Sequence, residues 1–172
     1  MLVGDSHLAR VRRDLRVIGP DVLNAARGGS TSLDLAAQTA SVELGEDDVV
    51  VVSVGTNDAA PWKQVPPPDF ERALRACLRA LAPRPTVYVA PPGVDEDRLS
   101  GRGNRTNAVV DTYRRVALTA CGETGARVVR ADLLVHGLGR AAFTEDGVHL
   151  SGAAYGVLLP AIASACEPRG GR

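Results

Sequence analysis

A run of β-branched residues near the middle of the chain limits the possible folds more than any other feature. From Val49 to Val54 every residue except Ser53 is valine, and the run ends at Gly55. A strand with one face in solvent alternates apolar and polar residues, whereas this segment is apolar at consecutive positions. The run therefore predicts a central strand of a parallel sheet, buried on both faces.

Weaker segments of the same kind, together with helical patterns, predict the rest of the fold. Four further segments predict strands: residues 1–3, 21–25, 86–90 and 126–131. Helices are predicted by apolar residues at helical spacing, or by a largely apolar segment, in residues 33–40, 70–81, 109–120 and 153–165. Because strands and helices alternate along the chain, we expect a three-layer α/β/α sandwich with five parallel strands and right-handed crossovers.

Length and charge exclude several classes of protein. A chain of 172 residues is long enough for one hydrophobic core, so we expect a single domain over residues 1–167 and a flexible tail at 168–172. Its 20 basic and 20 acidic side chains balance, so no overall field attracts nucleic acid or an anionic membrane. No segment has the roughly 18 apolar residues of a membrane span, and no signal peptide is recognisable. We therefore expect a cytoplasmic protein with neither nucleic acid nor membrane as a partner.

The cysteines and histidines do not have the spacing of a metal site. Cys77, Cys121 and Cys166 show no CxxC pattern, and no histidine pair lies near them. They predict buried free thiols in a reducing compartment. The three histidines are too scattered in the sequence to form a three-ligand site. We expect neither a metal nor another cofactor.

Polar residues and glycines gather in the loops that follow the predicted strands. These segments are Gly4-Asp5-Ser6-His7 after the first strand, Arg27-Gly28-Gly29-Ser30-Thr31 after the second, Gly55-Thr56-Asn57-Asp58 after the third, and Asp146-Gly147-Val148-His149 before the last helix. In an open parallel sheet, ligands bind in the loops at the carboxyl ends of the strands. We therefore expect these four loops to form one site.

The residue types in these loops can supply nucleophilic catalysis. A serine hydroxyl needs a histidine that takes its proton, and the histidine needs a carboxylate that fixes its tautomer. Ser6, His149 and Asp146 supply these three groups. The backbone N–H groups of Ser6 and Gly29 and the side-chain amide of Asn57 can donate hydrogen bonds to a developing oxyanion.

Each loop taken alone also has a simpler interpretation. Ser6 can cap a helix, Gly28-Gly29 can form a turn or hold a phosphate, and Asn57-Asp58 is a common turn pair. A single histidine beside an aspartate, such as His149, is often a surface residue. The occurrence of all four loops in one chain favours the catalytic interpretation.

Taken together, the four loops resemble the sequence blocks of the SGNH or GDSL hydrolase superfamily. Gly4-Asp5-Ser6 matches the first block, Gly29 the second, Gly55-Thr56-Asn57-Asp58 the third and Asp146-Gly147-Val148-His149 the last. The resemblance covers nearly the whole chain and implies a flavodoxin-like sheet of about five parallel strands. By position, it implies that Ser6 is the nucleophile, His149 the base and Asp146 its orienting carboxylate, with an oxyanion hole of Ser6, Gly29 and Asn57.

The activity that this resemblance implies is hydrolysis of a small acyl ester through an acyl-enzyme on Ser6, and two alternatives stay open. His7, and the residues Leu150-Ser151 after His149, resemble superfamily domains linked to O-acyl transfer, in which an alcohol accepts the acyl group. The alternative of another class is a flavodoxin-like module that binds a phosphate or nucleotide, although the Gly28-Gly29 loop lacks the lysine of a P-loop. His7 itself is expected to cap or pack rather than to take part in catalysis.

Residues near these loops bear on the substrate. Trp62 lies in a proline-rich segment after Asn57, and Arg27 adjoins the glycine loop, so both are candidate substrate-binding residues. The ring suits an acyl chain or a sugar face, and an ordered surface connection is the alternative for its segment. Arg102 and Arg105, after the fourth predicted strand, add the hypothesis of an anionic ester or thioester. The expected partner is a small-molecule acyl ester or an acylated sugar or natural product.

Overall fold

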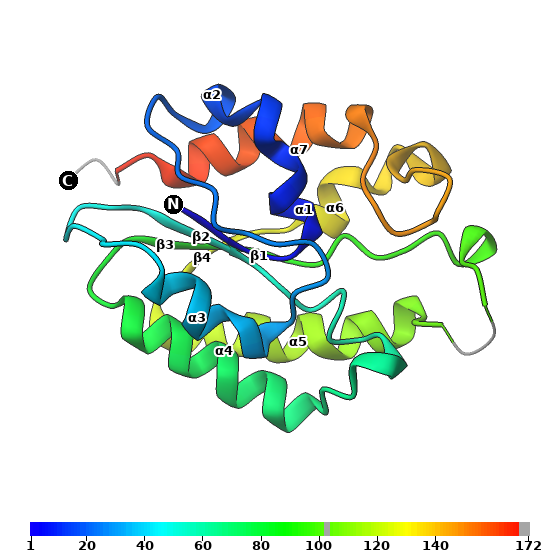
Figure 1. Cartoon of the computed structure of the whole chain (residues 1–172). Coiled ribbons are helices and arrows are strands. Elements are labelled where there is room, and N and C mark those ends of the chain that lie inside the picture. Colours follow the sequence, from blue (N-terminus) through cyan, green and yellow to red (C-terminus); the bar gives the residue numbers. More distant parts are fainter. Residues whose placement is uncertain (102–103, 169–172) are drawn as a thin grey trace.

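A four-stranded parallel sheet lies at the centre of the computed structural model, which describes residues 1–101 and 104–168 (Figure 1). The strands are β1 (Leu2–Gly4), β2 (Val50–Ser53), β3 (Thr86–Val89) and β4 (Arg127–Val129), side by side in that order. Val51 of β2 pairs with Leu2 on one side and with Val87 on the other. The valine run therefore forms an inner strand, as predicted.

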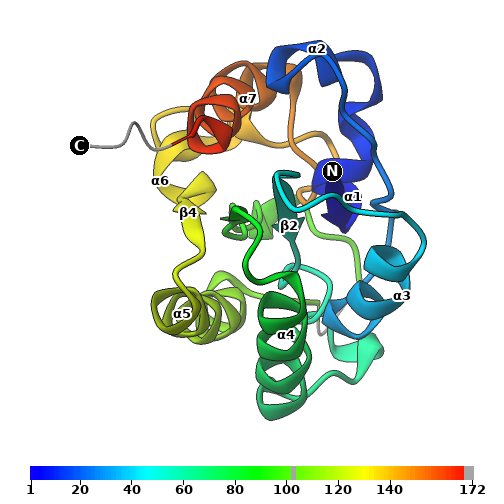
Figure 2. The ribbon, with the colours of Figure 1, turned by 90° about the vertical axis from the view of Figure 1, so that its left-hand side faces the viewer.

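Helices cover both faces of this sheet. They are α1 (Ser6–Ala9), α2 (Leu15–Ile18), α3 (Leu35–Ala40), α4 (Pro67–Leu81), α5 (Asn107–Thr124), α6 (Ala131–His136) and α7 (Gly152–Cys166), with short 3-10 turns at Arg10–Arg13, Ser32–Asp34, Pro61–Lys63, Glu96–Arg98 and Gly139–Ala142. In Figure 1, α3, α4 and α5 lie below the sheet and the other helices above it. Figure 2 shows the sheet end-on between α4 and α7. The predicted three-layer α/β/α architecture is confirmed.

The two faces of the sheet bury two separate apolar clusters. Val50 and Val52 point into the cluster that contains residues of α4 and α5. Val51, between them, points to the opposite face, where Leu158 and Ile162 of α7 pack. Successive side chains of a strand point to opposite faces. The consecutive valines Val50, Val51 and Val52 thus supply both cores, which is why their pattern predicts burial on both sides.

The sheet has four strands among the described residues rather than the five predicted, because residues 21–25 do not form a strand. This segment runs beside β1: Leu2 N donates to Leu23 O at 2.8 Å, and Ala25 N donates to Leu2 O at 2.9 Å. Among the described residues, the only bridge that this segment forms is between Leu2 and Asn24. Leu23 is 51% exposed, so the segment lacks the cover that an apolar strand needs at the edge of the sheet.

The carboxyl ends of the strands lie at the right of Figure 1, and the N-terminus lies at the opposite end. The loops that follow the strands therefore gather at one edge of the sheet. Among the described residues, no helix is both long and apolar enough to cross a bilayer. Of the predicted tail at residues 168–172, residues 169–172 lie outside the described residues.

The cysteines do not form disulfides. Cys77 and Cys121 are buried free thiols, as predicted, and Cys166 is half-buried. Burial raises the pKa of the Cys77 thiol to about 11 and that of Cys121 to about 12. Within residues 1–101 and 104–168, no group of three His, Cys, Asp or Glu side chains is arranged to hold a metal ion.

Candidate active site

The turn between β1 and α1 presents Ser6 at the first position of a helix. Gly4 has a φ of +125°, and a Cβ on it would lie 1.9 Å from Ser53 O, so a larger residue does not fit. The residue that caps α1 is Asp5, whose carboxylate accepts a hydrogen bond from His7 N at 3.0 Å. The capping role considered for Ser6 is therefore filled by its neighbour. Ser6 itself is 8% exposed at the edge of the sheet.

A tight turn brings the carboxylate of Asp146 onto the imidazole of His149. His149 Nδ1 donates to Asp146 Oδ2 at 2.5 Å. Asp146 Oδ1 accepts from Val148 N, His149 N and Thr144 Oγ1, each at 2.9 Å. Gly147, with a φ of +71°, allows the chain to turn back between them. Burial raises the pKa of Asp146, but these hydrogen bonds outweigh it and hold the pKa well below its ordinary value. The bond to Nδ1 leaves Nε2 of His149 as the nitrogen that can accept a proton.

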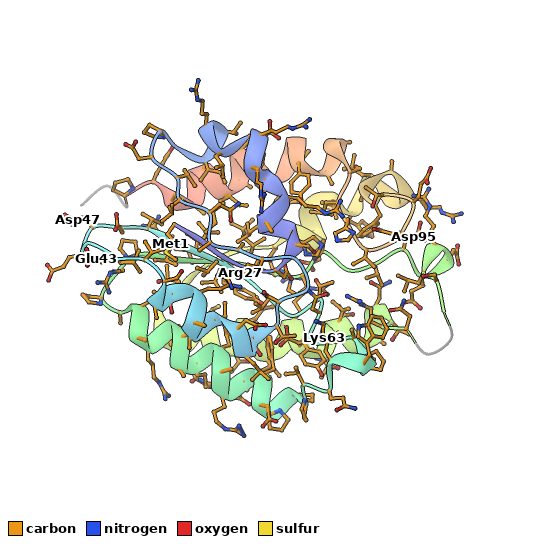
Figure 3. The ribbon with its side chains drawn as sticks, viewed as in Figure 1. Met1, Arg27, Glu43, Asp47, Lys63 and Asp95 are labelled. Atoms are coloured by element: carbon orange, nitrogen blue, oxygen red, sulfur yellow. The ribbon has the colours of Figure 1, made fainter. Side chains whose placement is uncertain are left out.

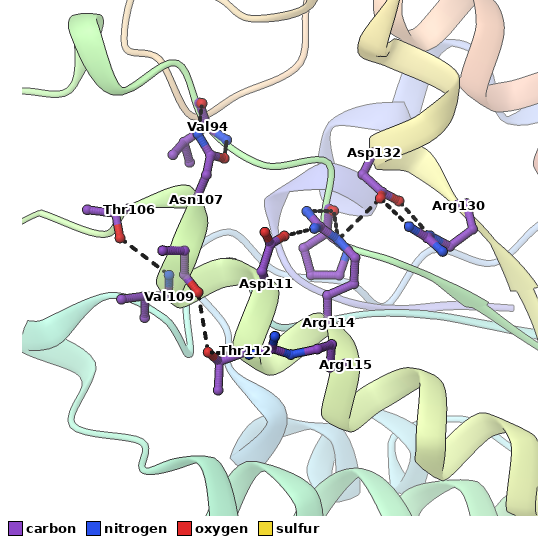
Figure 4. A network of polar contacts seen from close by, with 12 residues as sticks. Val94, Thr106, Asn107, Val109, Asp111, Thr112, Arg114, Arg115, Arg130 and Asp132 are labelled. Carbon is purple, nitrogen blue, oxygen red and sulfur yellow. Dashed lines mark hydrogen bonds and ion pairs between the residues drawn. The ribbon is translucent and has the colours of Figure 1, made fainter.

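The loop after β3 packs against this turn and holds it in place. Asp95 N donates to Gly147 O at 2.8 Å, and a Cβ on Gly147 would lie 2.5 Å from Asp95 O. Asn107, in the first turn of α5, fixes the same loop through Val94 (Figure 4). Its Oδ1 accepts from Val94 N and its Nδ2 donates to Val94 O, each at 2.9 Å. The position of the Asp146–His149 turn therefore depends on the start of α5.

A buried arginine anchors the beginning of that loop. Arg114 of α5 donates to Pro91 O from Nε at 3.0 Å and from Nη2 at 2.8 Å. It also pairs with Asp111 and, at 3.7 Å, with Asp132 (Figure 4). Burial lowers the pKa of Arg114, and Asp132 acts in the opposite direction. The loop is thus held to α5 at two positions, Pro91 and Val94.

Asn57 lies against the glycine loop, with its amide held at both ends. Its Nδ2 donates to Ser30 O at 2.9 Å, and its Oδ1 accepts from Arg105 Nη1 at 3.2 Å. Of the described residues only Ser30 accepts from Nδ2, so the second N–H of this amide has no acceptor among them. Gly29 has a φ of +78°, and its carbonyl accepts from Lys63 Nζ at 2.7 Å. The structure thus brings the two loops with the predicted oxyanion donors together.

The first and last segments of the site meet through His7. Its Nε2 lies 3.2 Å from Val148 O. Ser6 precedes His7 in the chain and His149 follows Val148, so this contact joins the segment of the predicted nucleophile to the segment of the predicted base.

No local sequence pattern singles out Gln38, which links two of the loops. Its Nε2 donates to Gly4 O and to Ser30 Oγ, each at 3.0 Å. The turn that carries Ser6 is thereby tied to the glycine loop. A buried polar residue on α3 is the signal for such a link, but it becomes visible only once the helix is packed against β1.

The family of the chain follows from its match to a family model. Residues 4–157 match the model of the GDSL-like Lipase/Acylhydrolase family. The chain belongs to this family. Similar solved structures include a lipase/acylhydrolase from Enterococcus faecalis, with a TM-score of 0.77, 22% identity, and coverage of 95% of this chain and 92% of that chain. An acetylxylan esterase from Geobacillus stearothermophilus gives a TM-score of 0.72 with 19% identity over 98% of this chain and 93% of that chain. These two likenesses show the fold alone. Comparison with curated protein sequences gives no significant match.

Cationic side chains border the site of this GDSL-like hydrolase. Trp62 is 58% exposed, and the guanidinium of Arg105 lies over its ring at 5.1 Å from the centroid. Burial lowers the pKa of Arg105, whereas Asp5 and Asp146 act in the opposite direction. Arg27 is exposed beside the glycine loop, and Figure 3 labels it. Arg102 lies outside the described residues.

Proposed function

We propose that this GDSL-like hydrolase is a serine esterase that cleaves a small acyl ester through an acyl-enzyme on Ser6. The observation that carries the proposal is the Asp146–His149 pair on a turn that His7 contacts from the position next to Ser6. The structures of similar fold include catalytic mutants of the acetylxylan esterase in which a serine or an aspartate is replaced by alanine. The residues replaced in those mutants, a serine and an aspartate, are of the same types as Ser6 and Asp146, which supports the roles that we propose for them.

In the acylation step, Ser6 Oγ attacks the carbonyl carbon of the ester while His149 Nε2 takes the hydroxyl proton. Asp146 holds the Nδ1 proton and stabilises the imidazolium that forms. The backbone N–H groups of Ser6 and Gly29 and the amide of Asn57 donate to the oxyanion. When the tetrahedral intermediate collapses, the C–O bond to the alcohol breaks and His149 returns its proton to the leaving oxygen.

In the deacylation step, water attacks the carbonyl carbon of the acyl-enzyme with His149 again as the base. The acyl C–O bond to Ser6 Oγ then breaks, and His149 returns the proton that it took from water to Oγ, which leaves a carboxylic acid and free Ser6. Trp62 offers an exposed ring that suits an acyl chain or a sugar face. Together with the acetylxylan esterase among the similar structures, this makes an acetylated sugar one candidate substrate class.

Substitution of Ser6 tests the proposal. With p-nitrophenyl acetate as substrate, Ser6→Ala should lower kcat by at least about 10³-fold. Mass spectrometry of the intact wild-type protein should show an acyl adduct on Ser6 that His149→Ala abolishes. Ser164→Ala, at an exposed position of α7, is the matched control and should keep full turnover. Wild-type turnover in Ser6→Ala would reject the proposal.

Product analysis separates hydrolysis from acyl transfer. An esterase releases one carboxylic acid for each alcohol, even when a sugar or another alcohol acceptor is present at high concentration. Accumulation of acylated acceptor would instead identify a transferase, which is the alternative raised by His7 and Leu150-Ser151. Since both reactions use the same acyl-enzyme, the Ser6→Ala result does not distinguish them.

A further inference from the structure

His7 follows the proposed nucleophile directly and is enclosed by the protein, with 1% of its surface exposed. Its imidazole lies between two turns, because Nδ1 is 3.4 Å from Asp5 Oδ1 and Nε2 is 3.2 Å from Val148 O. Its backbone is held as well: His7 N donates to Asp5 Oδ1 at 3.0 Å, and Tyr155 OH donates to His7 O at 2.9 Å. His7 therefore contacts the β1–α1 turn, the Asp146–His149 turn and α7.

The surroundings of the ring favour an N–H group on each nitrogen. A backbone carbonyl can only accept a hydrogen bond, so Nε2 carries a proton, and the carboxylate of Asp5 favours a proton on Nδ1. Burial lowers the pKa of His7 and Arg105 also lowers it, but Asp5 and the Val148 carbonyl outweigh them and raise the pKa above its ordinary value. With Nε2 directed at a carbonyl and the ring buried, His7 is not placed to act as a general base.

The contact with Val148 O acts directly on His149. The carbonyl of Val148 and the N–H of His149 belong to the same planar peptide group. His7 Nε2 binds the oxygen of this group at 3.2 Å, and Asp146 Oδ1 accepts its N–H at 2.9 Å. The peptide plane is thus fixed at both ends. Because it leads into the Cα atom of His149, it helps set the direction in which the imidazole leaves the backbone.

We propose that His7 is a positioning residue that holds the proposed base, His149, in place relative to Ser6. The inference rests on the proposed function, because it gives His7 a task in the same site. An apolar side chain at position 7 would fill the space but leave the Val148 carbonyl without a donor, and the turn would relax. A displacement of about 1 Å at a reacting group can cost on the order of 10²-fold in rate.

Two substitutions distinguish the effect of losing the hydrogen-bond donor from the effect of losing the volume of the ring. His7→Leu removes the donor, whereas His7→Gln keeps an N–H group near the position of Nε2. We expect kcat for p-nitrophenyl acetate to fall about 10- to 100-fold in His7→Leu with little change in KM, and to stay within about fivefold of wild type in His7→Gln. The matched control is His136→Leu, at the exposed end of α6, which should keep the wild-type kcat.

Amide hydrogen exchange measures the same link without relying on activity. The N–H groups of Val148 and His149 both donate to Asp146, so their protection reports whether the turn is intact. The peptide that covers residues 144–150 should exchange faster in His7→Leu and at the wild-type rate in His7→Gln. Unchanged exchange in His7→Leu, or an equal loss of kcat in both variants, overturns the proposal.

A second variant keeps the test available if His7→Leu does not fold. Removal of His7 alone leaves Asp5 as an unpaired buried carboxylate, which is strongly destabilising. The double variant Asp5→Asn with His7→Leu removes both charged partners at once. It should retain the low kcat and the fast exchange of residues 144–150, because Val148 O still lacks its donor. Recovery of the wild-type kcat in the double variant overturns the proposal.

Failure of the proposed function would look different. If Ser6 is not a nucleophile, wild type and His136→Leu both fail to react with a fluorophosphonate probe, while the exchange of residues 144–150 still reports the link through His7. If wild type reacts with the probe and His7→Leu reacts equally fast, only the inference about His7 is contradicted.

Discussion

Asp146 both orients the neighbouring imidazole and stays ionised, and it does so through the same hydrogen bonds. Its Oδ1 accepts three donors and its Oδ2 accepts the Nδ1 proton of His149. Burial raises the pKa of Asp146, yet these donors hold the pKa well below its ordinary value. The carboxylate therefore keeps its charge in mildly acidic solution, where an unperturbed aspartate begins to take up a proton.

Replacement of this carboxylate by an amide tests its orienting role. Asp146→Asn should lower kcat by about 10²- to 10⁴-fold with a smaller change in KM, because an amide N–H facing Nδ1 favours the wrong tautomer of His149. Glu145→Gln removes the same charge at the exposed neighbouring position and should leave kcat unchanged. Steady-state kinetics on the three proteins at neutral pH measure the effect. A kcat close to wild type in Asp146→Asn contradicts the role.

The pairing of His7 with Asp5 predicts how stability depends on pH. A histidine with a raised pKa in the folded state adds stability that is fully present below the unfolded pKa of about 6.5 and is lost as pH rises through the folded pKa. Wild type should therefore exceed His7→Gln in the free energy of unfolding by more at about pH 5.5 than at about pH 9. Urea unfolding at the two pH values measures both margins. Equal margins would mean that His7 does not gain a charge on acidification.

The sequence predicts candidate reactive residues but not the groups that hold their loops in place. Ser6, Asp146 and His149 lie in short blocks whose internal spacing largely sets their local geometry. Gln38 reaches a partner 34 positions away and Arg105 a partner 48 positions away. Such contacts depend on how the helices and loops pack, so no local pattern signals them.

At the level of the elements, the loop after β3 contacts both α5 and the Asp146–His149 turn, so the position of the turn depends on the position of α5. Gly147 is the contact point, because Asp95 N donates to its carbonyl and Asp95 O leaves no room for a Cβ. This contact is set by backbone atoms of two loops, so a single methyl group at position 147 should disturb it.

Gly147→Ala should lower kcat at least about tenfold and the free energy of unfolding by roughly 1–3 kcal/mol, because a φ of +71° and the contact with Asp95 O both oppose a side chain. Gly137 is the matched control: its φ is −65° and a Cβ there meets nothing within 4 Å. Gly137→Ala should leave kcat unchanged and should be neutral or stabilise by about 0.4–1 kcal/mol. Kinetics and urea unfolding on both variants test this, and equal behaviour of the two glycines contradicts it.

Arg105 and Arg27 lie on different loops, and we expect them to have different roles. Arg105 should orient Asn57, whereas Arg27 should bind the charge of an anionic substrate. The sequence treats Arg27 and Arg105 alike, as candidates to bind an anionic substrate, but Arg105 Nη1 binds Asn57 Oδ1 at 3.2 Å and Arg27 is exposed. Arg105→Ala should lower kcat about tenfold for neutral and anionic esters alike. Arg27→Ala should raise KM about two- to fivefold for an anionic ester only. KM and kcat for a matched pair of esters measure both effects, and the same pattern in both variants contradicts the distinction.

Elements could be predicted from the sequence where burial alone decides them. The valine run becomes an inner strand because both of its faces are covered, and the apolar residues of the long helices α4, α5 and α7 pack in the two cores. Residues 21–25 fail as a strand because they lie at the edge of the sheet, where Leu23 faces solvent. Whether an edge segment pairs as a strand depends on the neighbouring strand and on the elements that cover it. A local sequence pattern carries no information about either.

At the level of the whole molecule, the sheet separates two apolar cores, and the proposed catalytic side chains Ser6, Asp146 and His149 belong to neither core. One cluster packs between the sheet and α4 and α5, and the other between the sheet and α7. Stability should therefore arise on both faces independently of the chemistry at the loops.

Substitutions on opposite faces of the sheet test this independence. Leu74→Ala on α4 should lower the free energy of unfolding by about 2–5 kcal/mol and Ile162→Val on α7 by about 0.5–1.5 kcal/mol, since both side chains are fully buried in different clusters. The double variant should show the sum to within about 0.5 kcal/mol, because the two sites share no partner. Leu133→Ala, at an exposed position of α6, is the control and should lower the free energy of unfolding only slightly.

Urea unfolding measures these free energies, and kcat per folded molecule should stay at the wild-type value in all four variants. A loss that departs from the sum would mean that the sheet transmits strain between its faces, and a fall in kcat would mean that core packing reaches the loops that hold Ser6 and His149.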